Sequence, residues 1–552
     1  MASERGEPAW LNAYPPSINW RAPLAVSTIP KMLDDAAERA PHRVALTFQG
    51  IAITYGELAD LARRFAAALR ERGIGRGKTV ALYLPNSPYH PIALFGALKT
   101  GAQIVHLSPL DVEHELTHKL RDCSARVIIT LDRDPFLAHV ERLRHAGLLD
   151  LIIVGDAQPW LPEDDGSRPR AQIEGVETFS DLLANHAEVP SPATQLDDAA
   201  IIQYTGGTTG PAKGVVLTHR NVTAAIASLN SWMAHQPYAG PGQDRHICVL
   251  PLFHVFALVA LMLRAIANAE TIFLHARFDV DAVLHDVEVN RASWFFAVPT
   301  MLIALCARED LAYRDLSSLR FCAAGGAALP AEVARRVEKI TGHAVTIGWG
   351  MTETAGVGTI TPGAGLNKDG SVGVPLPGIF IDVVSTENPA KVLSSGEVGE
   401  LRVRGPNVMT AYLHNEGDAT FSDGGLLTGD IGYVDEDGFV FLVDRKKDLI
   451  ISGGFNVYPR AIEDAIYKHP AVEEVLVVGI PDAYRGEAAK AFIRLRVGHE
   501  PFTLAELRSF LEGRVGRQAV PSALEFRDSL PRTAVGKLCK KELRSDRRDS
   551  GD

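Results

Sequence analysis

Short apolar runs alternate with amphipathic helical patterns through the first 130 residues of the chain. One helix is expected to begin after Thr54, because Thr54 and Glu57 stand at the spacing of a capping box. Apolar residues then recur on one face until Gly73 ends the pattern. Strands that alternate with helices favour βαβ units and a parallel sheet, so an α/β fold is predicted. The expected strands are 79–84, 103–107 and 126–130, and the expected helices are 88–100 and 113–122.

The alternation of strands and helices resumes after residue 219 and later gives way to a different pattern, which indicates more than one domain. From about residue 397 short strands and tight turns predict a small β-rich subdomain, and the charged run at 443–448 marks the main boundary. We therefore predict a large domain of parallel αβ subdomains over 1–444 and a small mobile α+β domain over 445–552. Residues 157–172 are expected to form a polar surface loop. The other expected strands are 247–250, 271–274, 293–298, 319–323, 474–479 and 490–496, and the expected late helices are 460–468 and 504–514.

Composition excludes several classes of protein. Lys and Arg number 56 against 67 Asp and Glu, and the net charge of −11 argues against a general nucleic-acid binder. The five cysteines contain no CxxC pair, which fits a reducing compartment and no zinc or disulfide framework. The start lacks a signal-peptide core, the apolar run 255–263 is too short to span a bilayer, and the end is no peroxisomal address. We expect a cytoplasmic protein without a transmembrane segment. Weak peripheral contact with a membrane stays open, and the oligomeric state is expected to be a monomer or a homodimer.

The stretch 204–219 carries the strongest functional signal. Apolar runs at 199–202 and 215–217 predict strands on either side of it. Glycines let the backbone approach a ligand closely, and successive N–H groups with hydroxyls and a lysine cradle oxyanions such as phosphates. The alternative is an ordinary flexible hairpin loop. The residues of this loop are Thr205, Gly206, Gly207, Thr208, Thr209, Gly210 and Lys213.

This loop is not the nucleotide-binding loop of P-loop NTPases, which needs Gly-Lys followed by Ser or Thr. Ala212 precedes Lys213 and Gly214 follows it. The stretch instead resembles the phosphate loop of the adenylate-forming superfamily, which comprises acyl-CoA synthetases, peptide-synthetase adenylation domains and luciferases. Five further stretches resemble motifs of the same superfamily in the same order, so the resemblance covers nearly the whole chain.

The first three of these stretches imply an acid and adenine site. His254 ends Pro-Leu-Phe-His, where the family places an aromatic residue or histidine beside the acyl carboxylate; alone it would be read as a structural histidine. The stretch 324–329 resembles the wall of the adenine pocket, with Gly326, Ala327 and Ala328, although such loops are usually only tight turns. In Gly-Trp-Gly-Met-Thr-Glu at 348–353, Trp349 is the candidate for adenine stacking. Thr352 can donate to a phosphate, and Glu353 offers a hard oxygen to Mg²⁺.

The last two stretches imply a ribose site and a catalytic lysine. Asp430 can accept hydrogen bonds from both ribose hydroxyls and Arg445 can donate to them, whereas an Asp in a turn is usually a turn former. Lys537 matches the family's catalytic lysine, although lysines near a terminus are normally solvated. The resemblance places the family's hinge at Lys447, within 444–447.

The resemblance also implies the chemistry. The 205–213 loop would hold the β- and γ-phosphates of ATP, Mg²⁺ on Glu353 would neutralise them, and Lys537 would bridge the carboxylate and the α-phosphate. The acyl adenylate would then be attacked by CoA after the C-terminal domain rotates. Ser452, Gly453 and Gly454 would border the pantetheine arm, since glycines permit close approach.

The leading interpretation is an acyl-CoA ligase for a medium- or long-chain fatty acid, because the chain looks most like bacterial fatty-acyl-CoA ligases. Its predicted partners are a small-molecule carboxylic acid, ATP and CoA. A dicarboxylate or an aryl acid stays open as the substrate. A CoA-independent acyl-AMP ligase typically carries an inserted segment, and none is apparent. A peptide-synthetase module would continue into a carrier domain, whereas this chain ends soon after Lys537. Luciferase activity and a non-catalytic nucleotide-binding regulator are the remaining alternatives, the latter disfavoured because every motif residue is present.

Overall fold

The computed structural model describes most of the chain, and its residues fall into two compact units. The first unit comprises residues 8–205, 212–380 and 404–414, and the second comprises 381–403 and 420–545. The described ranges are 8–155, 176–184, 194–205, 212–234, 242–326, 329–363, 367–414, 420–453, 455–533 and 538–545. The polar stretch predicted at 157–172 lies outside them.

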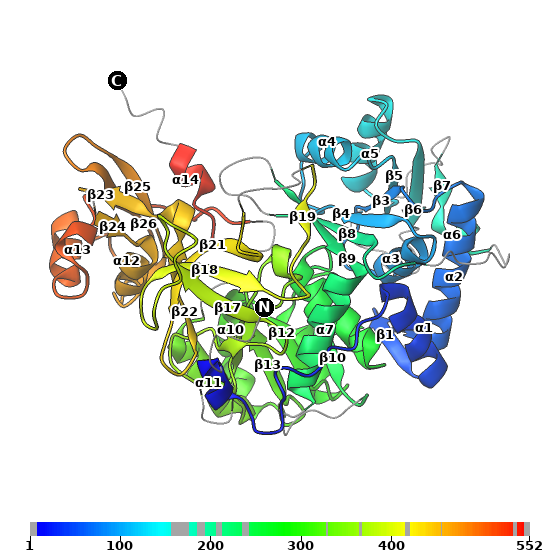
Figure 1. Ribbon diagram of the computed structural model, residues 1–552, viewed down its shortest axis with the longest axis horizontal. Helices are drawn as coiled ribbons and strands as arrows, with labels where there is room; N and C mark the ends of the chain where they lie inside the picture. Colours follow the sequence, from blue (N-terminus) through cyan, green and yellow to red (C-terminus); the bar gives the residue numbers. More distant parts are fainter. Residues whose placement is uncertain are drawn as a thin grey trace. The chain divides into compact units, whose positions relative to one another are not determined.

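An eight-stranded sheet forms one part of the first unit (Figure 1). Its strands run parallel from β8 to β7, and β9 pairs antiparallel with both β8 and β19 at the other end. Both faces are buried, since β5 is buried at every position, as expected for a parallel sheet. In spatial order the strands are β19 (Ala411–Tyr412), β9 (Gly214–Thr218), β8 (Ala199–Tyr204), β4 (Gln103–His106), β3 (Thr79–Leu82), β5 (Val127–Leu131), β6 (Leu151–Gly155) and β7 (Glu177–Thr178).

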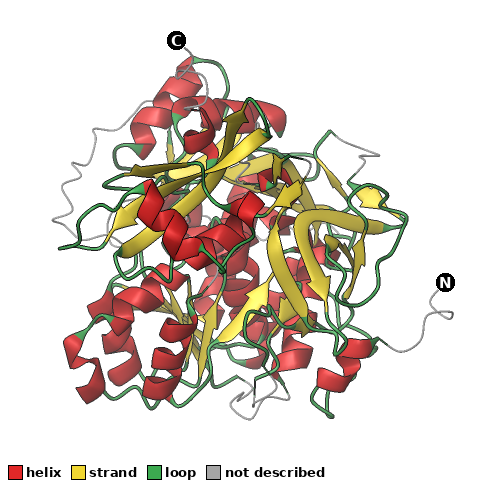
Figure 2. Ribbon diagram, turned by 90° about the vertical axis from the view of Figure 1, so that its left-hand side faces the viewer, coloured by secondary structure: helices red, strands yellow, loops and turns green. Residues whose placement is uncertain are grey.

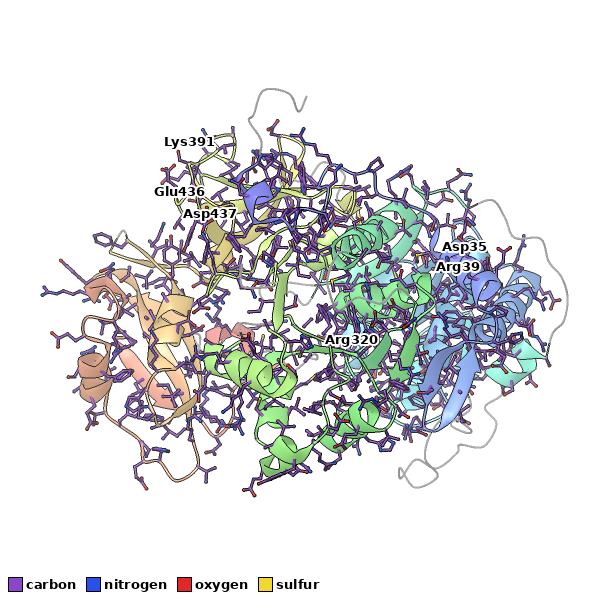
Figure 3. All side chains as sticks on the ribbon, turned by 90° about the horizontal axis from the view of Figure 1, so that it is seen from below. Asp35, Arg39, Arg320, Lys391, Glu436 and Asp437 are labelled. Atoms are coloured by element: carbon purple, nitrogen blue, oxygen red, sulfur yellow. The ribbon has the colours of Figure 1, made fainter. Side chains whose placement is uncertain are left out.

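A nine-stranded sheet forms the other part of the first unit. It is parallel from β14 to β1 and antiparallel at both edges. A polar cluster joins the starts of three strands: buried Asp244 accepts from Ser293 Oγ (3.0 Å) and from Arg320 (2.6 Å), which is labelled in Figure 3. In order the strands are β16 (Val374–Pro375), β15 (Thr359–Ile360), β14 (Thr346–Trp349), β13 (Phe321–Ala324), β12 (Trp294–Ala297), β10 (Arg245–Cys248), β11 (Thr271–Leu274), β1 (Val44–Phe48) and β2 (Ile51–Thr54).

Helices flank the strands of these sheets (Figure 2). The predicted capping box is present: Thr54 accepts from Glu57 N–H, and the Glu57 carboxylate accepts from Thr54 N–H (2.8 Å). Asp35 and Arg39 lie on the first helix (Figure 3). The helices of the first unit are α1 (Ile29–Arg39), α2 (Tyr55–Glu71), α3 (Tyr89–Lys99), α4 (Glu113–Asp122), α5 (Phe136–His145), α6 (Phe179–Leu183), α7 (His219–Met233), α8 (Arg264–Ala267), α9 (Val280–Glu288), α10 (Pro299–Cys306) and α11 (Ala331–Thr341), with the π-helix η2 (Phe256–Leu263) and the short 3-10 helices η1 (Ala9–Ala13), η3 (Glu309–Tyr313) and η4 (Thr352–Thr354).

The second unit contains two five-stranded sheets. In the first sheet β21 pairs antiparallel with β18, β20 and β22, and Figure 3 labels Lys391, Glu436 and Asp437 in its loops. The first sheet comprises β17 (Phe380–Val384), β18 (Gly399–Arg404), β20 (Phe421–Ser422), β21 (Gly425–Val434) and β22 (Val440–Arg445). The second comprises β23 (Ile450–Ser452), β24 (Phe455–Val457), β25 (Val472–Asp482), β26 (Gly486–Leu495) and β27 (Ala523–Phe526), with α12 (Pro459–Ile466), α13 (Leu504–Leu511), α14 (Lys541–Ser545) and the 3-10 helices η5 (Lys446–Asp448) and η6 (Arg517–Ala519).

The predicted fold class is confirmed: parallel αβ subdomains, a β-rich subdomain and a small α+β part follow one another. Two features were not predicted. The apolar run after His254 forms a π-helix, and the short strand β19 returns to the eight-stranded sheet from far along the sequence. Within the described ranges, no helix is both long and apolar enough to cross a membrane. The division into two units does not test a pivot at 444–447, so the predicted boundary there stays a prediction.

Two histidines lie against each other in the core of the first unit. His90 on α3 and His106 at the end of β4 are buried, with ring centroids 5.1 Å apart. None of their four ring nitrogens has the geometry of a hydrogen bond to another described residue, although the Gln203 amide lies close enough to His106 to raise its pKa. Burial nevertheless lowers the pKa of His90 well below 6.5 and that of His106 to about 3.

We expect this pair to make the first unit sensitive to acid. Below pH 6.5 these histidines are protonated in the unfolded chain, whereas in the folded protein they stay neutral until the pH nears 3. The unfolded state therefore binds more protons, and the free energy of unfolding rises with pH across this window. His106→Asn should reduce the slope of unfolding free energy against pH by about 1 kcal/mol per pH unit between roughly pH 5 and 6. Urea unfolding followed by tryptophan fluorescence measures the slope, with exposed His42→Asn as the control for loss of a histidine. Equal slopes in wild type and His106→Asn would contradict the assignment.

Candidate active site

The two ends of the predicted phosphate loop meet at the base of a β-hairpin. Strands β8 and β9 pair antiparallel, and Thr205 N–H donates to the carbonyl of Lys213 (3.0 Å). Residues 206–211, which include Gly206, Gly207, Thr208, Thr209 and Gly210, lie outside the described residues. The described ends therefore place Thr205 and Lys213 next to each other.

Helix α4 anchors this hairpin. The hydroxyl of Tyr204, directly before the loop, donates to Asp122 Oδ2 (2.6 Å) and approaches the carbonyl of Lys119 (3.1 Å). Burial raises the pKa of Tyr204, which keeps the phenol protonated as a donor. At the other end of the loop, the Nε2 of His118 lies 3.5 Å from the carbonyl of Ala212. Sequence reasoning missed these anchors, because they join α4 to residues far along the chain.

His254 lies in the turn between β10 and the π-helix. Its Nδ1 accepts from Phe256 N–H (3.3 Å), which assigns the ring proton to Nε2 in the neutral form. The amide of Gln203, near the end of β8, donates to the carbonyl of Phe253 (2.6 Å). This bond ties the turn to the strand that leads into the phosphate loop.

The segment after β13 packs against the same turn. A Cβ on Gly325 would stand 3.1 Å from the Phe256 ring, so glycine lets the two segments pack closely. Gly326 is exposed and has a φ of +83°, which favours glycine. Ala327 and Ala328 lie outside the described residues. The described part of the predicted adenine wall therefore lies close to the turn that carries His254.

Trp349 ends β14 and is only 8% exposed. Its ring covers Gly358, where an added Cβ would stand 2.6 Å from the indole. One side of the ring thus contacts protein, and little of the residue is exposed. Thr352 follows as the first residue of η4 and is half-buried.

Glu353 is 6% exposed and is held by its main chain and by its side chain. Its carbonyl accepts from Met409 N–H (2.7 Å), and its carboxylate Oε1 accepts from the hydroxyl of Tyr412 (2.7 Å). The ammonium of Lys213 lies 4.7 Å from the centroid of the same tyrosine ring. The structure therefore links two predicted site residues, Lys213 and Glu353, through Tyr412, which sequence reasoning missed.

The chemistry of Glu353 fits the predicted Mg²⁺. Mg²⁺ prefers oxygen ligands and is commonly held by one or two carboxylates together with substrate phosphates. Such a site needs no preformed cage, and the described residues contain no group of three or more His, Cys, Asp or Glu arranged for a metal ion. One carboxylate held in a fixed position is thus a sufficient protein ligand for such a Mg²⁺ ion.

The predicted ribose residues meet in the second unit. Pairing of β21 with β22 sets Asp430 opposite Arg445, and Arg445 Nε lies 3.0 Å from Asp430 Oδ1. Asp430 is buried, whereas Arg445 is exposed. Buried Glu400 supports the turn, since it accepts from Gly429 N–H (3.0 Å) and pairs with Lys446 (2.8 Å). This arrangement offers a fixed carboxylate next to a guanidinium.

The predicted hinge and CoA residues follow in the same unit. Lys447 is exposed within the 3-10 turn η5, and Ser452 is buried in β23 with no hydrogen-bond partner for its Oγ among the described residues. Gly453 has a φ of +58° and donates to the carbonyl of Arg485 (2.8 Å). Gly454 lies outside the described residues.

Contacts also join the chain before Lys447 to the chain after it. Asp444, in β22, accepts from Arg460 N–H at the start of α12 (2.9 Å). Burial raises the pKa of Asp444, and the charge of Lys540 opposes that rise. A rotation at Lys447 would separate Asp444 from Arg460, because the two residues lie on opposite sides of the turn.

Lys537 lies outside the described residues, but the segment after it is held by two ion pairs. Lys540 pairs with Glu463 (2.8 Å), and Arg544 pairs with Asp448 (2.6 Å). Glu463 also accepts from Val477 N–H (2.7 Å). All these partners follow Lys447 in the chain, so the pairs would move with a rotating C-terminal part.

Known proteins match this chain along nearly its whole length. Residues 33–413 match the AMP-binding enzyme family and residues 461–537 match the AMP-binding enzyme C-terminal domain. A long-chain-fatty-acid–CoA ligase of Bacillus subtilis (strain 168) is 36% identical over 550 residues, which cover 97% of each chain. A feruloyl-CoA synthase of an Amycolatopsis species is 36% identical over 512 residues, covering 92% of this chain and 96% of that one.

A solved structure shows the same fold. The o-succinylbenzoate coenzyme A synthetase of Bacillus subtilis, in complex with ATP and magnesium ion, matches with a TM-score of 0.79 and 30% identity, covering 93% of this chain and 99% of that chain. These matches confirm the predicted superfamily and the predicted class, an AMP-forming acid–thiol ligase. With its two family domains in order and full-length relatives, the chain belongs to the AMP-binding enzyme family.

Proposed function

We propose that this protein is an ATP-dependent acyl-CoA ligase that makes an acyl adenylate and then transfers the acyl group to CoA. The observation that carries the proposal is the link from Lys213 through Tyr412 to Glu353 in a chain whose full-length relatives are CoA ligases. A cation and a carboxylate held beside a glycine-rich hairpin suit a triphosphate and its metal ion. His254 is tied to the same hairpin through Gln203.

In the first half-reaction a carboxylate oxygen of the acid attacks the α-phosphorus of ATP and pyrophosphate leaves. Thr205, Lys213 and the loop between them bind the phosphates, and Thr352 donates to a phosphate oxygen. Mg²⁺, held by Glu353 when bound, supplies positive charge against the phosphate oxygens. Lys537 bridges the carboxylate and the α-phosphate as a compact cation with three donors. His254 lies beside the acyl carboxylate.

The adenine and the ribose of the nucleoside are bound by different residues. Trp349 and the segment at Gly326 border the adenine. Asp430 accepts from the ribose hydroxyls, and its ion pair with Arg445 orients the carboxylate.

In the second half-reaction the sulfur of CoA attacks the adenylate carbonyl, a thioester forms, and AMP leaves. The part of the chain after Lys447 rotates, which withdraws Lys537 and presents Ser452, Gly453 and Gly454 to the pantetheine arm. Hinges are a few residues at element ends that absorb the change in backbone angles, and η5 is such a place. The contact between Asp444 and Arg460 N–H breaks in this rotation.

The acid proposed is a medium- or long-chain fatty acid. The π-helix after His254 is apolar along its length, and Phe256 at its start is half-buried and packs edge to face on Phe296. Apolar side chains of this kind suit an apolar tail. An aryl acid is the second candidate, because the relative from Amycolatopsis is a feruloyl-CoA synthase over almost the same span.

A screen of acids decides between these substrates. With ATP and Mg²⁺, the protein should release AMP and form a thioester when CoA and a fatty acid of about 8 to 18 carbons are both present, since apolar burial favours longer tails. AMP and thioester are measured by liquid chromatography, with ferulate, pimelate and acetate as comparison acids. Preference for ferulate would replace the fatty acid by an aryl acid. Acyl-AMP without thioester would indicate a CoA-independent ligase, and ATP binding without turnover a regulator.

Lys537→Ala should separate the two half-reactions. We expect acid-dependent pyrophosphate release to fall at least about a hundredfold, because a charge that stabilises the transition state is lost. Thioester formation from supplied acyl adenylate and CoA should stay close to the wild-type rate. Lys541→Ala, in the helix that follows, is the control for removing a nearby lysine. Equal loss of both half-reactions would contradict this division of roles.

Lys447→Pro should impair the second half-reaction more than the first. Proline locks φ near −65°, so the turn can no longer absorb a large rotation. We expect thioester formation from acyl adenylate to slow by about tenfold or more, with smaller effects on pyrophosphate release. Lys447→Ala removes the charge and keeps the backbone free, so it should retain both rates. Unchanged thioester formation in the proline variant would argue against a hinge here.

A further inference from the structure

Tyr412 touches two groups to which the proposed function gives separate roles. Its hydroxyl donates to Glu353 Oε1 (2.7 Å), and its ring centroid lies 4.7 Å from the ammonium of Lys213. Each contact uses a different part of the side chain: the phenol oxygen serves the carboxylate and the π-face serves the cation. A phenylalanine could make only the second contact.

The backbone holds Tyr412 rigidly beside the phosphate loop. It lies in β19, which pairs antiparallel with β9 so that Tyr412 stands opposite Val215. The next residue, Leu413, donates its N–H to the carbonyl of Gly214 (2.7 Å), directly after Lys213. The position of the ring is therefore set by strand pairing with the end of the loop itself.

The chain before Tyr412 is fastened to the turn that carries Glu353. Met409 N–H donates to the carbonyl of Glu353 (2.7 Å). The amide of Asn407 donates to the carbonyls of Thr354 (2.9 Å) and Val357 (2.7 Å). We call residues 405–413 the bridging segment, because it contacts the loop at one end and the Glu353 turn along its length.

The two contacts differ from a direct ion pair in a way that matters for ATP. A tyrosine ring attracts the cation by its quadrupole and leaves the net positive charge in place. A hydrogen bond to Glu353 fixes the carboxylate without supplying a competing charge. Donation to a carboxylate also makes the phenol more electron-rich, so the two contacts reinforce each other.

We propose that Tyr412 is a positioning residue that pre-orders Lys213 for the phosphates and Glu353 for the metal ion, and so sets the affinity for Mg·ATP. The inference rests on the proposed function, in which Lys213 and Glu353 bind the triphosphate and its metal. It assigns Tyr412 no contact with the reacting atoms. Its two contacts predict two separable effects on ATP binding.

Calorimetric titration with ATP in the absence of acid tests this, because no turnover occurs without the acid. In the presence of Mg²⁺, Tyr412→Phe should weaken ATP binding about tenfold, the size of one lost hydrogen bond to a charged group. In EDTA the same variant should bind ATP as wild type does, because the ring and its contact with Lys213 remain. Tyr412→Leu should bind more weakly under both conditions, since it loses both contacts.

Two further variants make the result specific. In a Lys213→Met background, Tyr412→Leu should have no additional effect on ATP binding in EDTA, because its target is already gone. Tyr313→Phe removes a hydroxyl from a tyrosine that is 91% exposed, and should leave ATP binding unchanged. Melting temperatures of all variants are measured alongside, so that loss of folded protein is not mistaken for loss of affinity.

Different results would contradict the ligase function and the role of Tyr412. If wild type neither binds ATP nor forms AMP with any acid, the proposed function fails and Tyr412 has no such role. If wild type is active and Tyr412→Phe binds Mg·ATP with unchanged affinity, the inference is overturned while the function stands. Equal weakening of the phenylalanine variant with Mg²⁺ and with EDTA would also overturn it, since the effect would then be independent of the metal ion that Glu353 holds.

Discussion

Parallel strands impose the constraint on which the first unit depends: their carboxyl ends all lie on one edge of the sheet. Thr205 follows β8, His254 follows β10, Gly326 follows β13, and Glu353 follows β14. Ligands in open α/β sheets bind at this edge, because each loop there can carry a functional side chain on a rigid strand. The bond from Gln203 to Phe253 connects the edges of the two sheets. Motifs that are far apart in the sequence therefore lie at the same edge of a sheet, and no long loop is needed to bring them there.

The bridging segment holds two other parts of the first unit in place. Strand pairing with β9 and hydrogen bonds to the Glu353 turn hold one segment against two others. Binding a triphosphate brings several negative charges to one place, and groups that are already oriented need no rearrangement at that moment. A tyrosine serves here because a single rigid side chain offers both a donor and a π-face. The segment thus connects the strand that follows Lys213 to the turn that carries Glu353.

The second unit uses antiparallel pairing for a similar purpose. The register of β21 and β22 sets Asp430 opposite Arg445, and Glu400 on β18 supports both the turn before Asp430 and the lysine after Arg445. Ion pairs beyond Lys447 connect Lys540 and Arg544 to Glu463 and Asp448. Asp444, before the turn, accepts from the backbone N–H of Arg460, after it. The hinge at Lys447 stays a prediction.

The sequence by itself determined the order of elements and the family. Hydrophobic periodicity and the capping box at Thr54 placed most helices and strands close to their observed bounds, because these signals are local. The motifs placed Lys213, Glu353, Asp430 and Arg445 as candidates, and the structure brings each pair together. Only tertiary structure decided the π-helix, the strand β19 and the partners of Tyr204 and Tyr412. An all-apolar run shows no periodicity, a two-residue strand has no pattern of its own, and a contact between distant residues leaves no local trace. Local chemistry could therefore be read from the chain, whereas the coupling between its groups required the fold.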